Sequence, residues 1–249
     1  MEFLLERRDG VSAQTMAQAR RCVSSDLEEL AALQSAVRAA MPRPELFIPN
    51  TREELARDLA ESLCIGVWAE GALAAYVILR YCGDSRHNYA AYLDIPPCDW
   101  KYWANGDSAV VAPRWRGNGL QQRMIRLMEE WRRPEIIGIG CTVSPDNAYS
   151  LNNVQAMGFS VHTRCLMYGS NDRYVLKKQL TPLPGRYRHF KGNQYQVLET
   201  ATHSETREPM VVYRALYGER GLWVRPASMW FAHIERDGYA GPRFVYAGE

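Results

Sequence analysis

The chain has 249 residues, of which 47% are hydrophobic and 23% charged, and its formal net charge is +2. This composition is typical of a folded globular protein rather than a disordered one, and the length allows two domains. Residues 181–249 hold nine Lys/Arg and seven Asp/Glu, which leaves 21 of each sign in residues 1–180. Neither part has the basic excess of a nucleic-acid-binding domain, so we expect no nucleic-acid partner.

The six cysteines are scattered, and no C-x-x-C pair is present. This distribution is typical of free thiols in a reducing compartment and argues against a disulfide framework or a zinc site. The five histidines show no metal-ligand spacing either, so we expect no metal. The N-terminus carries charges within its first eight residues, and no apolar run approaches the roughly 20 residues of a membrane span. We therefore expect a cytoplasmic protein with no membrane partner.

The first eighty residues predict a strand, two helices and a β-hairpin. Ser25 and Thr51 are each followed three residues later by a glutamate, the capping box that marks a helix N-terminus. Glu70-Gly71 separates two apolar stretches, which is the pattern of a hairpin with a tight turn. The expected elements are a strand at 3–8, a helix from residue 25 that stops before Pro42, a helix from residue 51 to about Ser62, and a hairpin within 65–81.

Residues 82–103 form a long connection that is rich in aromatic and polar side chains. A connection of this length inside a compact domain is usually functional or disordered, and the aromatic content argues against disorder. We therefore expect it to contact a ligand. The candidate substrate-binding residues are Tyr92, Asp94, Trp100 and Tyr102.

The next eighty residues alternate strands and helices. The expected elements are strands at 108–112, 137–143, 159–168 and 174–180, a helix at 120–131 and a helix at 147–157. The order of elements up to residue 180 is then β-α-α-β-β-β-α-β-α-β-β, a mixed α/β architecture with a central mixed sheet flanked by helices. Residues 181–185, Thr-Pro-Leu-Pro-Gly, predict a linker between residues 1–180 and a small β-rich domain at 186–249.

The segment 110–120 runs from a strand through a glycine-rich turn into an amphipathic helix. Free amides and the positive end of the helix dipole make such a turn an anion site, and Gly117 and Gly119 let a phosphate approach the backbone. A plain strand-to-helix turn could use glycines in the same way. The segment is not a P-loop, since no Gly-Lys-Ser/Thr follows, and Gln122 stands where a dinucleotide fingerprint needs a third glycine.

Two motifs carry a family resemblance. Arg114-Trp-Arg-Gly117-Asn-Gly119 resembles the Arg/Gln-x-x-Gly-x-Gly signature of GNAT acetyltransferases, between a strand and a helix as in that family. Downstream, Asn147-Ala-Tyr-Ser150 followed by Gly158-Phe159 is similar to the family's Asn-x-x-Ser…Gly-Phe helix. The resemblance covers roughly residues 1–180 and implies a GNAT-like sheet and an acetyl-CoA-dependent N-acetyltransferase.

The resemblance also implies where acetyl-CoA would bind. The pyrophosphate would lie on the amides of about residues 116–122, the pantetheine arm would pair with the backbone of residues 109–111, and Asn147 would contact the arm from the next helix. The implied cofactor-binding residues are Ala109, Val110, Val111, Arg114, Arg116, Gly117, Asn118, Gly119, Leu120, Gln121, Gln122 and Asn147.

The implied reaction is direct attack of an amine, from a small molecule or an amino terminus, on the thioester carbonyl. The amine must lose a proton to a base, and the leaving thiolate must gain one. Asp107 is our candidate base, with Asp94, Asp99 and His87 as alternatives. Many GNAT enzymes use a tyrosine as the acid, but the corresponding residue here is Val154. We favour Tyr168 over Tyr149, with solvent as the alternative.

The departure at Val154 leaves a second hypothesis, in which the chain binds or senses acyl-CoA without turnover and its tail recruits a partner. In the tail, strands are expected at 194–202, 210–217 and 222–224. Its stretches 187–195 (Tyr-Arg-His-Phe-Lys-Gly-Asn-Gln-Tyr), 212–217 (Val-Tyr-Arg-Ala-Leu-Tyr) and 221–226 (Gly-Leu-Trp-Val-Arg-Pro) resemble a bacterial domain-of-unknown-function family, over residues 184–246. Its alternating aromatic and arginine residues could stack on a ligand or on nucleic acid, or one strand face could be core and the other solvated. The low net charge favours the second arrangement. The sequence does not set an oligomeric state, and a dimer is compatible with it.

Overall fold

The computed structural model describes residues 1–7 and 14–248, which fall into two compact units. The first unit consists of Met1–Tyr81, Ala104–Arg132 and Gly140–Lys177, and the second of Cys82–Trp103, Arg133–Ile139 and Lys178–Glu249. The second unit thus joins the long aromatic connection to the C-terminal part of the chain. Sequence reasoning did not anticipate this grouping, because it placed a boundary at 181–185 by chain order alone.

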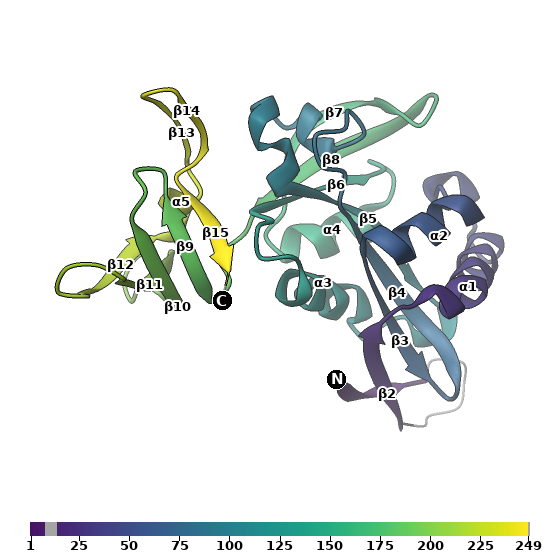
Figure 1. Ribbon diagram of the computed structural model, residues 1–249. Coiled ribbons are helices and arrows are strands. Elements are labelled where there is room, and N and C mark those ends of the chain that lie inside the picture. The colour runs from purple at the N-terminus through teal and green to yellow at the C-terminus, as the bar shows by residue number, and fades with distance from the viewer. Residues whose placement is uncertain (8–13, 249) are drawn as a thin grey trace. The chain divides into compact units, whose positions relative to one another are not determined.

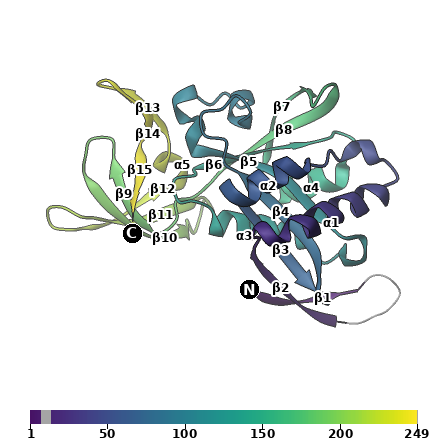
Figure 2. The same cartoon turned by 45° about the vertical axis from the view of Figure 1, so that its right-hand side comes forward.

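The first unit is built on an eight-stranded sheet with the order β1-β2-β3-β4-β5-β6-β8-β7. Figures 1 and 2 show α1 and α2 on one side of this sheet and α3 and α4 on the other. Its strands are β1 (Glu2–Glu6), β2 (Gln14–Arg21), β3 (Leu63–Ala69), β4 (Ala72–Arg80), β5 (Trp103–Val111), β6 (Gly138–Val143), β7 (Ser160–Met167) and β8 (Asn171–Gln179), and its helices are α1 (Leu27–Ala39), α2 (Arg52–Glu61), α3 (Leu120–Trp131) and α4 (Ala148–Ala156). The predicted mixed α/β fold class is confirmed.

Local sequence signals explain several of these boundaries. The amide of Glu54 donates to Thr51 Oγ1 at 3.1 Å and the amide of Thr51 donates to Glu54 Oε2 at 2.7 Å, so the predicted capping box opens α2. Glu70 and Gly71 have φ values of 53° and 75°, which form the predicted tight turn between β3 and β4.

The predicted capping box at Ser25 is wrong. Ser24–Asp26 form a short 3-10 turn, and α1 begins at Leu27 with no side-chain cap. The Asp26 carboxylate instead accepts two hydrogen bonds from Arg20, at 2.7 and 2.8 Å, and one from the amide of Val23 at 2.7 Å. The carboxylate of Asp26, at the start of the helix, therefore binds the guanidinium of Arg20 on β2 and does not cap α1.

Strand β2 was not predicted. It pairs antiparallel with β1 and with β3 and so connects them. Its inward-facing residues Ala17 and Ala19 are 1% exposed, but alanine carries little strand signal. Small buried side chains between polar ones gave no pattern from which a strand could be predicted.

The second unit contains a five-stranded sheet with the order β12-β11-β10-β9-β15 and a β13-β14 hairpin. Its elements are two 3-10 helices (Tyr89–Tyr92 and Pro97–Tyr102), β9 (Gly185–His189), β10 (Gln194–Thr202), β11 (Pro209–Ala215), β12 (Leu222–Pro226), α5 (Ala227–Trp230), β13 (His233–Arg236), β14 (Tyr239–Pro242) and β15 (Phe244–Gly248). The mainly-β character is confirmed, while β9, α5 and β13–β15 were not predicted.

Aromatic side chains form the core of this C-terminal region. Trp230 stacks on Phe244 with ring centroids 3.9 Å apart, and the rings of Tyr187 and Tyr213 meet the Trp230 ring edge-on. In β9 the flanking Arg186 and Arg188 are exposed while Tyr187 is buried. The alternation of aromatic and arginine residues here follows a strand with one packed and one solvated face.

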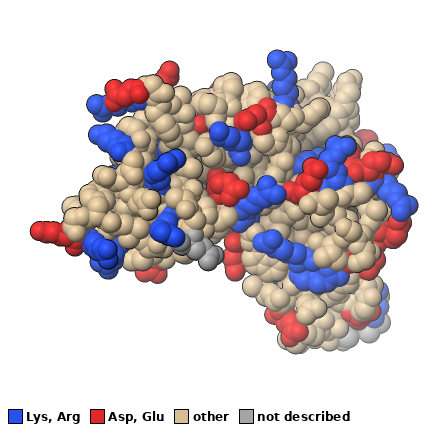
Figure 3. Space-filling view, viewed as in Figure 1, with Lys and Arg blue, Asp and Glu red and all other residues tan. Residues whose placement is uncertain are grey.

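The described helices are all too short or too polar to cross a membrane. On the face drawn in Figure 3, Lys and Arg are interspersed with Asp and Glu rather than gathered into a stripe of one sign. The mixed surface agrees with the small net charge of the chain.

Candidate active site

The turn between β5 and α3 is the most distinctive backbone feature of the first unit. Gly117 and Gly119 have φ values of 81° and 66°, a left-handed conformation that glycine adopts without strain. Gly119 is the N-cap residue of α3, and no side chain caps this helix end. A Cβ atom at Gly119 would meet nothing within 4 Å. No side chain caps the first amides of this twelve-residue helix, and uncapped amides at a helix start can bind anionic groups.

Some side chains around this turn are exposed to solvent, and others make contacts that hold the turn in place. Arg116 is exposed, and the Arg114 guanidinium lies 4.0 Å from the Glu70 carboxylate. Asn118 is engaged with β1, because its Oδ1 accepts from the Glu6 amide and its Nδ2 donates to the Glu6 carbonyl, both at 2.8 Å. The asparagine of the motif thus fastens the edge strand to the turn, a role that the sequence did not reveal.

Amide side chains connect the two helices that carry the motifs. Gln122 Nε2 donates to Asn153 Oδ1 at 3.1 Å, and Asn153 Nδ2 donates to Gln121 Oε1 at 3.0 Å. The Asn147 side chain caps its own helix by accepting from the Ser150 amide at 3.1 Å. The first turn of α3 is therefore held to the middle of α4 by side chains that follow the first motif and lie within the second.

Strand β5 contains a β-bulge at Asp107. Ile78 of β4 pairs with Ser108 and Leu79 pairs with Gly106, so Asp107 is the extra residue of the ladder. Bulges bend a strand and re-aim a side chain, and they are common beside active sites. The bulge directs Asp107 toward α2 and the segment before it, two residues ahead of the backbone expected to pair with the cofactor.

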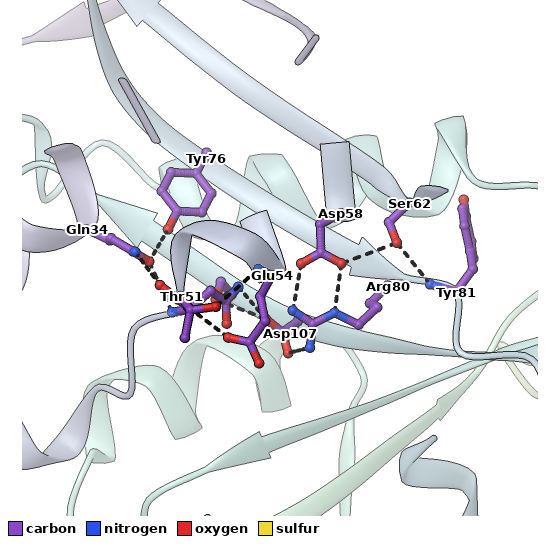
Figure 4. A network of polar contacts seen from close by, with 11 residues as sticks. Gln34, Thr51, Glu54, Asp58, Ser62, Tyr76, Arg80, Tyr81 and Asp107 are labelled. Carbon is purple, nitrogen blue, oxygen red and sulfur yellow. Dashed lines mark hydrogen bonds and ion pairs between the residues drawn. The ribbon is translucent and has the colours of Figure 1, made fainter. Parts of the chain in front are cut away.

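Asp107 belongs to a buried polar network on the α1–α2 side of the sheet (Figure 4). Its Oδ1 accepts from Arg80 Nη1 at 2.8 Å, and its Oδ2 accepts from Asn50 Nδ2 at 2.9 Å. Arg80 also donates twice to the Asp58 carboxylate, at 2.7 and 2.6 Å. One guanidinium thus contacts two carboxyl groups, so the network holds one more acidic group than it holds cations.

The environment of Asp107 favours its protonated form. Burial raises the pKa of the Asp107 carboxyl above its ordinary value, and Arg80 and Asn50 oppose this shift only in part. The second carboxylate, Asp58, acts in the same direction as burial. A carboxylate of raised pKa accepts a proton more readily than an ordinary aspartate does, which suits a general base.

The three residues considered for the acid differ in their surroundings. Val154 is buried within α4 and has no proton to give, and Tyr149 is 68% exposed on the same helix. Tyr168 lies in the β7–β8 turn with a φ of 52°, and its hydroxyl is 3.1 Å from Thr142 Oγ1 on β6. The guanidinium carbon of Arg173 lies 5.7 Å from the centre of the Tyr168 ring. Tyr168 therefore contacts both β6 and β8.

The candidate substrate-binding residues of the aromatic connection all fall in the second unit. Trp100 Nε1 donates to the carbonyl of Ile95 at 2.9 Å, and Asp94 has a φ of 53°. Tyr92 is exposed and Tyr102 is half-buried. Their role in substrate binding stays a prediction.

Asp99, one alternative base, is buried and engaged. Its Oδ2 lies 2.7 Å from Nδ1 of His233, a partner 134 positions away that no spacing rule could have identified. The Cys98, Asp99 and His233 ligand atoms lie within 4.8 Å of one another, a grouping that could hold a metal ion. The hydrogen bond between Asp99 and His233 already accounts for two of the three groups.

Comparisons with known proteins match two separate stretches of the chain. A family model described as "Acetyltransferase (GNAT) family" matches residues 28–159. A second model, described as "Protein of unknown function (DUF1653)", matches residues 185–246. Among curated proteins nothing matches the chain.

Solved GNAT structures have a fold similar to that of about two thirds of the chain. An acetyltransferase of the GNAT family from Streptococcus pneumoniae is 18% identical, with a TM-score of 0.51, and the match covers 66% of this chain and 99% of that one. The ribosomal-protein-S18-alanine N-acetyltransferase from Escherichia coli is 15% identical, with a TM-score of 0.51, over 68% and 97% of the two chains. A DUF1653 protein from Bordetella bronchiseptica is 38% identical over 26% of this chain and 87% of its own, with a TM-score of 0.26.

Proposed function

Because the chain belongs to the GNAT acetyltransferase family, we propose that it transfers the acetyl group of acetyl-CoA to an amine. The acceptor is a small-molecule amine or an amino terminus, and the nitrogen attacks the thioester carbonyl directly. The observation that carries this proposal is the uncapped N-terminus of α3 beside the bulged strand β5. This arrangement combines an anion site with the carboxyl group of Asp107, whose pKa is raised and which lies three residues before Val110.

The residues present fit acetyl-CoA. The pyrophosphate would lie on the amides of residues 116–122, where Gly119 leaves the backbone open and Arg116 is exposed. Strand β4 pairs with one edge of β5 along residues 105–111, and β6 is the neighbour on the other edge, so the pantetheine arm would pair with residues 109–111 where β6 leaves that edge open. When bound, acetyl-CoA supplies the activated acyl group.

The chain's own groups would handle the protons. Asp107, directly or through one water, would take the proton from the attacking amine. An N–H near Val111 would donate to the charge that develops on the acyl oxygen. The hydroxyl of Tyr168 would protonate the leaving thiolate, since the buried Val154 offers no proton.

Turnover tests the proposal directly. Purified protein should release CoA thiol from acetyl-CoA in the presence of a panel of primary amines and amino-terminal peptides, and should form the acetylated amine in equal amount. Loss of thiol release when the amine is omitted would show that transfer rather than hydrolysis is observed. Acetyl-CoA that binds but is never consumed would refute the proposal.

A second function is favoured by one observation, the buried valine at the position of the family's catalytic tyrosine. In that case the protein binds acyl-CoA without turnover, and residues 186–249 recruit a partner. The same panel separates the two functions, because a sensor would bind acetyl-CoA with no acetylated product.

A further inference from the structure

Arg173 of β8 is a buried cation without a counterion. The residue is 5% exposed, and its Nε is buried with no hydrogen-bond partner. Its Nη1 donates to the carbonyl of Leu46 at 3.2 Å. Within the described ranges 1–7 and 14–248, no carboxylate forms an ion pair with it. A buried charge of this kind is costly unless another group pairs with it.

Three buried aspartates of the protein are treated differently. Asp26 is paired with Arg20, Asp58 with Arg80 and Asp99 with His233. Arg173, in contrast, donates a hydrogen bond to the neutral carbonyl of Leu46 and lies over the face of the Tyr168 ring. Its guanidinium fork matches a carboxylate in two parallel hydrogen bonds, which the protein itself does not supply.

Arg173 is placed on the same side of the sheet as the candidate base. The segment between α1 and α2 donates to Asp107 through Asn50 and accepts from Arg173 through Leu46. Arg43 of the same segment donates to Asp146, just before α4, at 2.7 Å. Along the chain, this one segment therefore contacts the β6–α4 connection through Arg43, then β8 through Leu46, and then β5 through Asn50.

The separation of the two groups suits a small molecule. Leu46 and Asn50 are four residues apart, so the backbone between them spans at most about 14 Å. Only β6 separates β5 from β8 in the sheet order, which places those two strands about 10 Å apart. The Tyr168 hydroxyl rests on β6 between them.

From this geometry we propose that the acceptor is an amine that also carries a carboxylate, and that Arg173 binds this carboxylate while the amine faces Asp107. This inference rests on the proposed acetyl transfer and names its substrate class. The carboxylate belongs either to a free amino acid or to an acidic side chain of an amino-terminal residue. The guanidinium of Arg173 would bind either carboxylate in the same way.

Two matched pairs of acceptors distinguish these sources. L-alanine against L-alaninamide tests the α-carboxylate, and glutamic acid α-amide against glutaminamide tests a side-chain carboxylate. The charged member of at least one pair should have a kcat/KM more than about tenfold higher than its neutral partner. A factor of this size is what one hydrogen bond between charged groups typically contributes to binding.

The variants assign this preference to one residue. Arg173→Gln should remove it by raising KM for the charged acceptor with little change in kcat, and Arg173→Lys should restore part of it. Arg164→Gln is the matched control, because Arg164 lies on the neighbouring strand β7, is exposed and is paired with Asp172. A residue that only braced the α1–α2 segment would alter charged and neutral acceptors alike.

Equal use of charged and neutral acceptors, or a preference that survives Arg173→Gln, would overturn the inference while leaving acetyl transfer intact. If no acceptor is acetylated, the transfer proposal fails, and binding then decides the inference. N-acetyl-alanine should bind the CoA-loaded protein more tightly than N-acetyl-alaninamide in calorimetry, and Arg173→Gln should abolish the difference. Equal affinities would overturn it.

Discussion

Asp107→Asn is the substitution that tests the proposed base most sharply. General-base catalysis is typically worth about 10²–10⁴-fold, so kcat should fall by that factor while acetyl-CoA affinity stays unchanged. The asparagine can keep its oxygen toward Arg80, but its NH2 group then meets the NH2 group of Asn50. The loss of one charged hydrogen bond costs about 1.5–3 kcal/mol, and removal of a buried carboxylate beside Asp58 offsets part of this.

Asp58→Asn is the matched control. It lies in the same network and contacts the same guanidinium, with two hydrogen bonds at 2.7 and 2.6 Å rather than one. We expect it to lower the free energy of unfolding more than Asp107→Asn does, yet to leave kcat within a few-fold of wild type. Steady-state kinetics and denaturant unfolding on the two variants measure both effects. A wild-type kcat in Asp107→Asn, or an equal loss in Asp58→Asn, would refute the assignment.

The raised pKa of Asp107 adds a pH dependence with a definite sign. The base works in its ionised form, so kcat/KM should rise with pH through a pKa above the ordinary 3.8, and Asp107→Asn should lack this limb. The folded protein holds the proton more tightly than the unfolded chain does. The contribution of Asp107 to stability is therefore full below pH 3.8 and is lost as pH rises through the raised pKa.

Three further predictions concern other parts of the chain. Tyr168→Phe keeps the ring and loses the hydroxyl, so kcat should fall by about 10²–10⁴-fold with unchanged acetyl-CoA affinity, and wild-type turnover would make solvent the acid. Truncation after Leu180 should leave a protein that folds and binds acetyl-CoA in calorimetry, since both motifs precede it; an insoluble or non-binding fragment would show that the tail belongs to the core. Burial, with Arg225 next in effect, lowers the pKa of His189 to about 4, so acidification from pH 6.5 to 4 should destabilise the fold and lower the hydrogen-exchange protection factors of the β9 amides, measured against their intrinsic rates at each pH, and His189→Gln should weaken this response.

Sequence reasoning identified the features that depend on local chemistry. The strand–glycine–helix turn, the Thr51 capping box and the Glu70-Gly71 hairpin were predicted because backbone conformation at each is set by a few neighbouring residues. The second motif similarly placed Asn147 at a helix N-terminus.

The missed features depend on long-range contacts. Asp107 became informative through a bulge defined by pairing with β4, and through Arg80, 27 positions away. The Leu46–Arg173 contact spans 127 positions and the Asp99–His233 contact 134, and neither leaves a trace in local spacing. Strand β2 escaped detection because its buried residues are alanines that packing, not propensity, holds in a sheet.

The affinity of acetyl-CoA for a Gly119→Ala variant tests the central claim most directly. The added Cβ would meet no protein atom within 4 Å, so its effect on the fold is limited to the strain of a left-handed alanine, about 1–2 kcal/mol. Gly218→Ala carries the same kind of strain at a φ of 56°, also with open space around the Cβ, in the C-terminal region. Calorimetry should show acetyl-CoA binding weakened at least about tenfold by Gly119→Ala and unchanged by Gly218→Ala. Equal affinity in both variants and wild type would contradict an acetyl-CoA site on the α3 N-terminus.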